Sequence, residues 1–234
     1  MFLYIVAQCS SATIPTFMIK AVIFDLDGTL GDTLPLCVEA YRDCVAGLGH
    51  PRPTAEKVVS FFGLNDSGVL AGLLDMQPDD PALPIRSFVE SYIRLQPTLA
   101  ATPFPGTVEM MRALRAAGIR IGIISGKEHH TGNPTISLFG LDEFVEWRGF
   151  GSATRNCKHE RLAEVMKEWN LRPDEIIYVG DAPSDIELSH RVGVRIINAA
   201  WASTAAQEEA ACLALNPDWR LTDFSSLLPL ILSL

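Results

Sequence analysis

The sequence predicts an α/β fold, a doubly wound parallel sheet of Rossmann-like topology with a helical block inserted after its first strand. Two observations support this prediction. Beyond residue 103, short apolar runs alternate with helix-like stretches, a pattern typical of a parallel sheet with helices on its faces. Residues 34–102 hold only helix-like patterns, so we expect them to form a separate helical cap. Residues 18–33 and 103–234 would then form the core domain.

The first strand is expected over residues 20–25, "KAVIFD", because this short run is apolar and rich in β-branched side chains. A helix should follow over residues 32–48. Asp32 or Thr33 can act as its N-cap, and Gly49 can end it.

The remaining elements follow from the same patterns. In the cap we expect helices near residues 54–62, 66–75 and 84–96. After the prolines of "ATPFPGT" we expect a helix at 106–117, a strand at 119–125, a helix ending near 139, a strand at 143–148, a helix at 158–169, a strand at 175–181, a helix at 184–192 and a strand at 194–199.

The charge of the chain restricts its partners. A net charge of −9 and an isoelectric point near 5.0 argue against nucleic acid or an anionic membrane as the main partner. An anionic substrate would have to be met by local cations or a metal. The five cysteines are widely spread and lack zinc-site spacing, which favours reduced thiols in a cytoplasmic protein. No apolar run reaches the roughly 18–20 residues of a membrane span.

Residues 1–17 are interpreted as an N-terminal extension. They begin with an apolar stretch, but no lysine or arginine precedes Lys20, so the positive segment of a secretory signal is missing. The sequence from Met18, "MIKAVIFDLDGTL", would be a natural start for a chain whose first element is a strand. We therefore expect the extension to be dispensable for folding.

Polar residues follow the predicted strands at the points where the strands end. In open α/β sheets, ligands bind at this edge. The residues in question are Asp25, Asp27, Gly28 and Thr29 after the first strand, Ser125, Gly126 and Lys127 after the second, Lys158 after the third, and Asp181 and Asp185 after the fourth.

Each of these segments alone has an ordinary explanation as a turn, a helix cap or a solvated side chain. Together, in this order, they favour phosphoryl transfer. A carboxylate can attack phosphorus and form an acyl phosphate, and a second carboxyl group can move the protons. Mg²⁺ prefers hard oxygen ligands and would offset the repulsion between Asp25 and Asp27, which stand one residue apart.

The chain resembles the haloacid dehalogenase superfamily, in particular its phosphoglycolate-phosphatase-like branch with a helical cap. The resemblance covers residues 19–200 and is carried by "DLDGT" at 25–29, Ser125, Lys158 and "GDAPSD" at 180–185. It implies a Mg²⁺-dependent hydrolase with an aspartyl-phosphate intermediate.

The resemblance also implies roles for single residues. Asp25 would be the nucleophile and a Mg²⁺ ligand, and Asp27 the general acid and base, with its backbone carbonyl on the metal. Asp181 would be a further ligand, and Asp185 would support or replace it.

The phosphate would be held by four other residues. Thr29 would hold Asp27 or the phosphate, and Ser125 would bind phosphoryl oxygens together with the Gly126 amide. Lys158 would neutralise both the nucleophile and the phosphate.

Three features depart from the pattern of this branch. Gly31 stands where an aliphatic residue is usual, which should loosen the turn into the cap, and "NCKHERL" lacks a proline after Lys158. Pro134 interrupts a helix that is usually continuous, so we expect a loop over 127–132 and a helix start near Asn133. Lys127 and two solvated histidines would then lie near the mouth of the site.

The leading functional prediction is a phosphatase for a small phosphomonoester such as phosphoglycolate or a sugar phosphate, acting as a monomer or homodimer. A β-phosphoglucomutase-type phosphotransferase is the alternative, but residues 54–100 contain only Lys57, Arg86 and Arg94 as cations, few for holding a bisphosphate. A phosphonate hydrolase would need a catalytic cap lysine, and Lys57 is the only lysine there. A non-catalytic binding protein is disfavoured by the intact acidic set.

Overall fold

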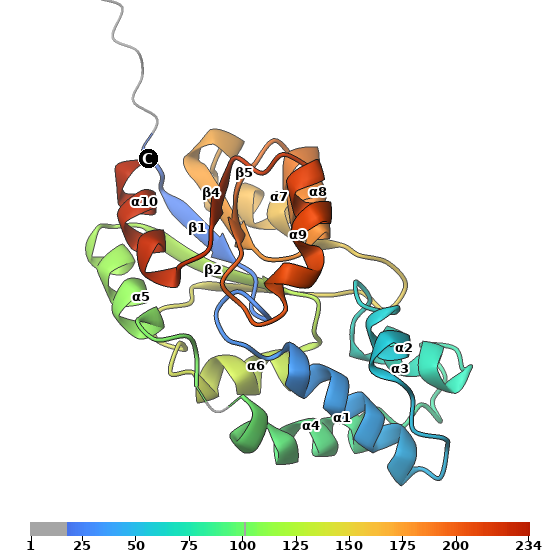
Figure 1. Cartoon of the computed structure of the whole chain (residues 1–234). Helices are drawn as coiled ribbons and strands as arrows, with labels where there is room; N and C mark the ends of the chain where they lie inside the picture. The colour runs from blue at the N-terminus through green and yellow to red at the C-terminus, as the bar shows by residue number, and fades with distance from the viewer. Residues whose placement is uncertain (1–17, 101) are drawn as a thin grey trace, which may run out of the picture.

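The computed structural model describes residues 18–100 and 102–234, and a six-stranded parallel sheet forms its centre (Figure 1). The strand order is β3-β2-β1-β4-β5-β6. The strands are β1 (Ala21–Phe24), β2 (Arg120–Ser125), β3 (Trp147–Phe150), β4 (Ile176–Gly180), β5 (Arg195–Ala199) and β6 (Trp219–Leu221). The predicted parallel α/β fold is confirmed.

Strand β1 lies in the middle of the sheet and is buried on both faces. Phe24 pairs with Ile123 of β2 on one side and with Val179 of β4 on the other. The chain builds outward from β1 through β2 and β3, then returns to the opposite side of β1 as β4. In open sheets, ligands bind at the carboxyl ends of the strands where the order reverses, which here are the ends of β1 and β4.

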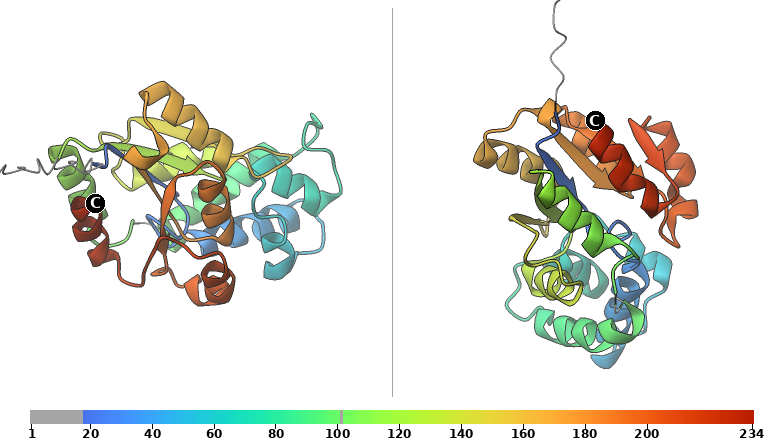
Figure 2. Two further views of the ribbon diagram at one scale, coloured as in Figure 1. Left: turned by 90° about the horizontal axis from the view of Figure 1, so that it is seen from above. Right: turned by 90° about the vertical axis from the view of Figure 1, so that its left-hand side faces the viewer.

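Helices cover both faces of the sheet (Figure 2). Val22 and Phe24 belong to one apolar cluster with residues of α5, α6 and α10, whereas Ala21 and Ile23 belong to another with α7, α8 and α9. This alternation follows from the two-residue period of a strand. The helices are α5 (Thr107–Ala116), α6 (His129–Leu138), α7 (Lys158–Trp169), α8 (Pro183–Arg191), α9 (Ala205–Ala214) and α10 (Leu227–Ser233).

Of the helices described between β1 and β2, the last, α5, packs on the sheet, and the four before it lie beyond the carboxyl ends of the strands (Figure 1). They are α1 (Leu34–Gly47), α2 (Ala55–Val59), α3 (Asp66–Leu74) and α4 (Ile85–Leu99), and we call them the cap. They share an apolar cluster of their own, in which the rings of Tyr41 and Phe88 stack with centroids 4.1 Å apart. Thr33 is the N-cap residue of α1. The observed cap helices match the three further helical stretches expected there.

The start of α6 differs from the prediction. The helix begins at His129 and carries Pro134 within it, whereas a loop was expected up to residue 132. Proline removes one intrahelical hydrogen bond, but tertiary contacts secure the first turn. Asp66 of the cap accepts hydrogen bonds from the Glu128 N–H and the Thr131 hydroxyl. The third strand also begins later than expected, at Trp147.

The elements α9, β6 and α10, which follow residue 199, were not predicted. The last two complete the sheet edge and one of its faces. The proposed extension at residues 1–17 lies outside the described residues. Among the residues described, no helix is both long and apolar enough to cross a membrane. The cysteines of this part, Cys37, Cys44, Cys157 and Cys212, are buried free thiols.

Replacing Pro134 by alanine should stabilise the protein. The substitution restores a backbone N–H inside α6, while the loss of the rigid ring gives back some freedom to the unfolded chain. We expect a net gain of about 1–2 kcal/mol, or a rise in melting temperature of about 2–8 °C at this chain length. Thermal unfolding measured by circular dichroism checks it, and an unchanged or lower melting temperature would show that the proline is accommodated without cost.

Candidate functional site

The first acidic residue of the site lies where β1 ends. Asp25 follows Phe24, donates its backbone N–H to the Val179 carbonyl at 2.8 Å and is 4% exposed. The chain then turns at Gly28, whose φ of +74° is a conformation that glycine adopts at little cost. The Gly28 N–H donates to the Gly31 carbonyl at 2.9 Å, which closes this turn.

Gly31 is held at this position by packing. A Cβ there would lie 2.5 Å from the ring of Phe139, so an aliphatic side chain would have to displace that ring. Glycine at position 31, where the family usually has an aliphatic residue, therefore leaves room for the buried ring of Phe139.

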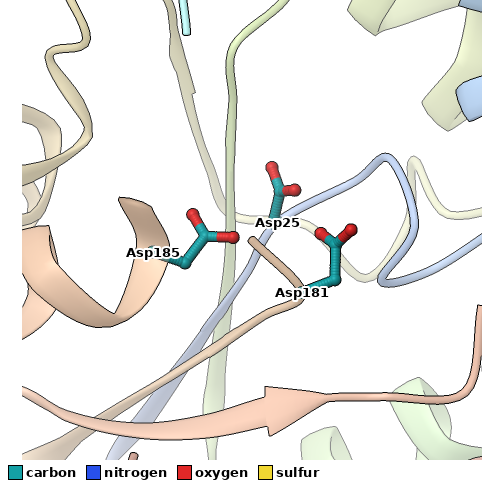
Figure 3. Close-up of side chains that lie close together, drawn as sticks. All are labelled: Asp25, Asp181 and Asp185. Atoms are coloured by element: carbon teal, nitrogen blue, oxygen red, sulfur yellow. The ribbon is translucent and has the colours of Figure 1, made fainter. Parts of the chain in front are cut away.

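Three carboxylates converge at this edge of the sheet (Figure 3). Asp25 comes from the end of β1, Asp181 follows β4, and Asp185 lies in the first turn of α8. One carboxylate oxygen of each lies within 4.8 Å of the others. Segments that are far apart in the sequence thus bring three acidic groups to one point.

A lysine lies among these carboxylates. The Lys158 ammonium is 3.1 Å from Asp25 Oδ1 and 2.6 Å from Asp185 Oδ1. Asp185 also accepts hydrogen bonds from the Tyr178 hydroxyl at 3.2 Å and the Ala182 N–H at 3.0 Å. Asp185 is thereby held in one orientation, and it orients Lys158 toward Asp25.

Burial changes the protonation of this cluster. It raises the pKa of Asp25 to about 7, against the opposing charge of Lys158 and with the help of Asp185 and Asp27. Burial and the neighbouring Asp25 and Asp185 also raise the pKa of Asp181 well above its usual value. Burial by itself would lower the pKa of Lys158, but Asp185 and Asp25 outweigh it and raise that pKa instead.

The three carboxylates fit a small divalent cation. They provide only oxygen donors, the ligand type that Mg²⁺ prefers. One ammonium cannot balance the negative charges of the buried Asp25 and Asp185 and the partly exposed Asp181. After burial, repulsion within this group is a further cause of the raised pKa of Asp25 and Asp181. A divalent cation would offset this repulsion.

Asp181 is positioned by the turn after β1. The Thr29 hydroxyl donates to Asp181 Oδ1 at 3.2 Å, while the Trp201 indole N–H donates to the Thr29 carbonyl at 3.1 Å. A Cβ on Gly28 would lie only 2.2 Å from Asp181 Oδ2. Gly28 therefore allows the turn and Asp181 to approach each other closely.

Asp27 has a different set of partners and is not one of the three converging carboxylates. Its Oδ1 accepts a hydrogen bond from the Thr33 hydroxyl and lies 3.1 Å from the Lys127 ammonium. Its Oδ2 accepts from the Ser125 hydroxyl at 3.4 Å. Asp27 thus joins the first strand's turn to the loop after β2.

That loop contains the remaining predicted residues. Ser125 is fully buried at the end of β2, and its hydroxyl accepts the Lys127 N–H at 3.2 Å. Gly126 lies directly against the loop after β3, because a Cβ on Gly151 would be 2.1 Å from the Gly126 carbonyl oxygen. The predicted site residues therefore form two adjoining groups, one around Lys158 and one around Asp27.

Lys127 is buried and contacts both the core and the cap, which its position in the sequence did not indicate. It is 6% exposed, and its ammonium lies 3.0 Å from the Cys37 sulfur and 4.6 Å from the centre of the Tyr92 ring, both residues of the cap. The sequence placed it near the mouth of the site but assigned it no role. Its place two residues after Ser125 at a strand end was the available signal, since the contacts with the cap could not be read from spacing.

A parallel sheet that collects buried carboxylates and a lysine at its carboxyl edge, beneath a helical cap, defines an α/β enzyme with a candidate metal site. The chain belongs to the haloacid dehalogenase-like hydrolase family, whose model matches residues 22–199. The expected family and the expected hydrolase class are confirmed.

Individual relatives agree with this. A phosphoglycolate phosphatase of Thiobacillus denitrificans is 31% identical over 184 residues, which cover 75% of this chain and 80% of that protein. CbbY of Rhodobacter sphaeroides, solved in complex with phosphate, has a TM-score of 0.73 at 21% identity and covers 90% of this chain and 96% of its own. A predicted phosphoglycolate phosphatase of Haemophilus somnus has a TM-score of 0.70 at 20% identity, covering 91% and 97%. The two structures show the shared fold.

Replacing Gly28 by alanine should disrupt the candidate metal site. The new Cβ would displace the Asp181 carboxylate, so we expect the affinity for Mg²⁺, measured by titration calorimetry, to fall about tenfold or more. Gly49→Ala is the matched control, because Gly49 also has a positive φ, +83°, but no atom lies within 4 Å of a Cβ there. Both variants should lose about 1–2 kcal/mol of stability from backbone strain. Equal Mg²⁺ affinities in the two would contradict the prediction.

Replacing Asp25 by asparagine should stabilise the metal-free protein at high pH. The pKa of Asp25 is higher in the folded protein, about 7, than its ordinary value of 3.8. Its contribution to stability is therefore full below 3.8 and is lost as the pH rises through 7. The asparagine side chain carries no charge, so with chelator present the variant should melt about 2–4 °C above the natural protein at about pH 8. The difference should be clearly smaller at about pH 5, where only the first part of the loss has occurred.

The control for this comparison is Asp79→Asn, which changes an exposed acidic residue in the loop between α3 and α4. It should leave the melting temperature unchanged at both pH values. A stabilisation by Asp25→Asn that is equal at both pH values would contradict the assignment of the effect to the ionised carboxylate.

Proposed function

We propose that the protein is a Mg²⁺-dependent phosphatase that hydrolyses a small phosphomonoester through an aspartyl-phosphate intermediate. The observation that carries the proposal is the meeting of Asp25, Asp181 and Asp185 around Lys158 at the carboxyl edge of the sheet. Phosphoryl transfer needs such positioning and charge compensation more than any other contribution from a protein.

Asp25 is the proposed nucleophile. One of its carboxylate oxygens forms a bond to phosphorus as the bond from phosphorus to the leaving oxygen breaks. Lys158, 3.1 Å from Asp25 Oδ1, offsets the negative charge of both the carboxylate and the incoming phosphate. Asp185 holds Lys158 in place for this.

Asp25, Asp181 and the Asp27 backbone carbonyl would hold Mg²⁺, with Asp185 beside them. When bound, Mg²⁺ supplies charge compensation for the equatorial phosphoryl oxygens. The hard oxygen donors and the excess negative charge support this assignment. The hydrogen bond from Thr29 to Asp181 orients one of the proposed ligands.

Asp27 is the proposed general acid and base. It gives a proton to the leaving oxygen, then takes one from the water that attacks the aspartyl-phosphate and restores Asp25. Its hydrogen bonds with Thr33 and Ser125 fix the orientation of the carboxyl group. Ser125 and the Gly126 amide are the proposed donors to the phosphoryl oxygens.

The relatives and the small number of cations in the cap support the proposed substrate class. The Thiobacillus denitrificans relative is named phosphoglycolate phosphatase, and CbbY has also been solved with xylulose 1,5-bisphosphate. A small phosphorylated metabolite such as phosphoglycolate or a sugar phosphate is therefore proposed as substrate. The buried thiols support action in the cytoplasm.

Hydrolysis of p-nitrophenyl phosphate tests the proposal. We expect turnover that requires Mg²⁺ and falls by about 10³-fold or more in Asp25→Asn, which removes the nucleophile. Asp27→Asn should also lose at least about 10²-fold, because a proton donor and acceptor is removed. The control, Asp79→Asn, should retain the activity of the natural protein. Turnover that survives in Asp25→Asn would exclude the proposed nucleophile, and the absence of turnover on a panel of small phosphates would exclude the proposed phosphatase.

A further inference from the structure

We infer that Asp66, a buried carboxylate of the cap, is a positioning residue that holds the loop formed by Ser125–Glu128 in the conformation that binds phosphate. This inference rests on the proposed function, which gives that loop its role. Asp66 belongs to the first turn of α3, is 4% exposed and was not among the residues that the sequence singled out.

The hydrogen bonds of Asp66 connect the cap to the core. Its Oδ2 accepts the Glu128 N–H at 3.0 Å and also the Thr131 hydroxyl, both from the core. Its Oδ1 accepts the Tyr41 hydroxyl of the cap at 3.0 Å. A carboxylate this deeply buried is costly, and burial raises the pKa of Asp66, opposed by the charge of Lys127. Such a group is tolerated when it has several donors, and two of these donors lie at the start of α6.

The connection is reciprocal. Glu128 is the N-cap residue of α6, and its own side chain makes no capping hydrogen bond within that helix. Instead its Oε1 accepts the N–H of Ser67, which lies in the first turn of α3, at 3.0 Å. Each helix thus has one N–H at its start bound by a carboxylate of the other, an arrangement that the positive end of a helix favours.

The loop held in this way is the proposed phosphate-binding loop. Lys127 directly precedes Glu128, and its N–H donates to the hydroxyl of Ser125, three residues before Glu128. Fixing the Glu128 amide therefore fixes the peptide groups on which the Gly126 amide and the Ser125 side chain depend. A misplacement of such donors by about 1 Å can lower the rate of a reaction at the site by about a hundredfold.

The loop after β3 also contacts the phosphate loop. The Gly151 N–H donates to the Lys127 carbonyl at 3.0 Å, and the Asn65 N–H of the cap donates to the Ser152 carbonyl at 2.9 Å. The loop after β3 is therefore held between the cap and the phosphate loop. Asp66 completes this contact on the side of α6.

The experiment compares Asp66→Ala and Asp66→Asn. Alanine removes every acceptor, whereas the asparagine carboxamide can place its oxygen toward the Glu128 N–H and its nitrogen toward the Tyr41 hydroxyl. In the presence of Mg²⁺, we expect Asp66→Ala to weaken binding of inorganic phosphate about tenfold and to raise KM for p-nitrophenyl phosphate in parallel. Asp66→Asn should change both by no more than about threefold.

Asp43→Ala is the matched control. Asp43 is also a hydrogen-bonded carboxylate of the cap, but its recorded partners, Ser91 and Arg94, belong to the cap as well. A variant that only destabilises the cap would lose active molecules and lower kcat, leaving the phosphate affinity and KM within about twofold. This split distinguishes positioning of the loop from a general structural effect.

Amide hydrogen exchange provides a readout that requires no ligand. Asp66→Ala should speed exchange at Glu128 and the first turn of α6, while Asp43→Ala should not. Unchanged exchange there, or phosphate affinity equal to that of the natural protein, would overturn the inference. So would an Asp66→Asn variant as defective as Asp66→Ala, since charge and not hydrogen-bond acceptance would then be responsible. If the natural protein neither binds phosphate nor turns over substrate, the proposed function fails, and exchange at Glu128 alone decides whether Asp66 holds the loop.

Discussion

The excess of buried negative charge at the end of β1 is the constraint on which the rest of the structure depends. Asp25, Asp181 and Asp185 lie within reach of one another, and Lys158 lies among them with one opposite charge. Charges are expensive to bury, so such a cluster persists only where a rigid scaffold imposes it. Here the scaffold is the parallel sheet, whose central strands β1 and β4 end at the same edge. The same excess that costs stability is the charge that the proposed Mg²⁺ would offset.

The cap supplies the second boundary of the site. Asp27 and Lys127 belong to the core, yet the Lys127 ammonium lies against Cys37 and the Tyr92 ring from α1 and α4. A buried ammonium next to an aromatic face and a carboxylate is well compensated in this position. Both the cap and the core therefore contribute to the surroundings of Asp27. In this respect the cap is part of the site as well as its cover.

Much of the fold could be predicted because its signals are local. Apolar β-branched runs ending in aspartate or serine identified β1, β2 and β4, and the acidic residues could be assigned to one edge of the sheet from topology alone. The start of α6 could not be predicted, since Pro134 argues against a helix there and the compensating contact comes from Asp66, more than 60 residues earlier. Strand β6 was missed because it is short and only partly buried, which gives a weak pattern.

The candidate site likewise contains residues that local sequence identifies and residues that it does not. Residues next to strand ends, such as Asp25, Ser125 and Asp181, were recognised from their place in the sequence. Lys127 and Asp66 were not given roles, because their burial and partners depend on how the cap meets the core. A lysine or an aspartate near a helix start is most often solvated, so nothing in their immediate neighbours distinguishes them. Long-range packing decides their surroundings, and the spacing of residues along the chain gives little information about such packing.

The insertion of the cap after β1 also affects how the chain is made. Strand β1 leaves the ribosome early, but Val22 pairs with Ile121 and Ile177, which are synthesised much later. At about 5–20 residues per second, this strand waits several seconds or longer for its neighbours. All four of its side chains are fully buried in the finished protein, so during this time an apolar segment is exposed without partners. The helices of the cap, which pack mainly on one another, can form meanwhile, and the nascent chain is then a folded lobe preceded by a segment suited to capture by a chaperone.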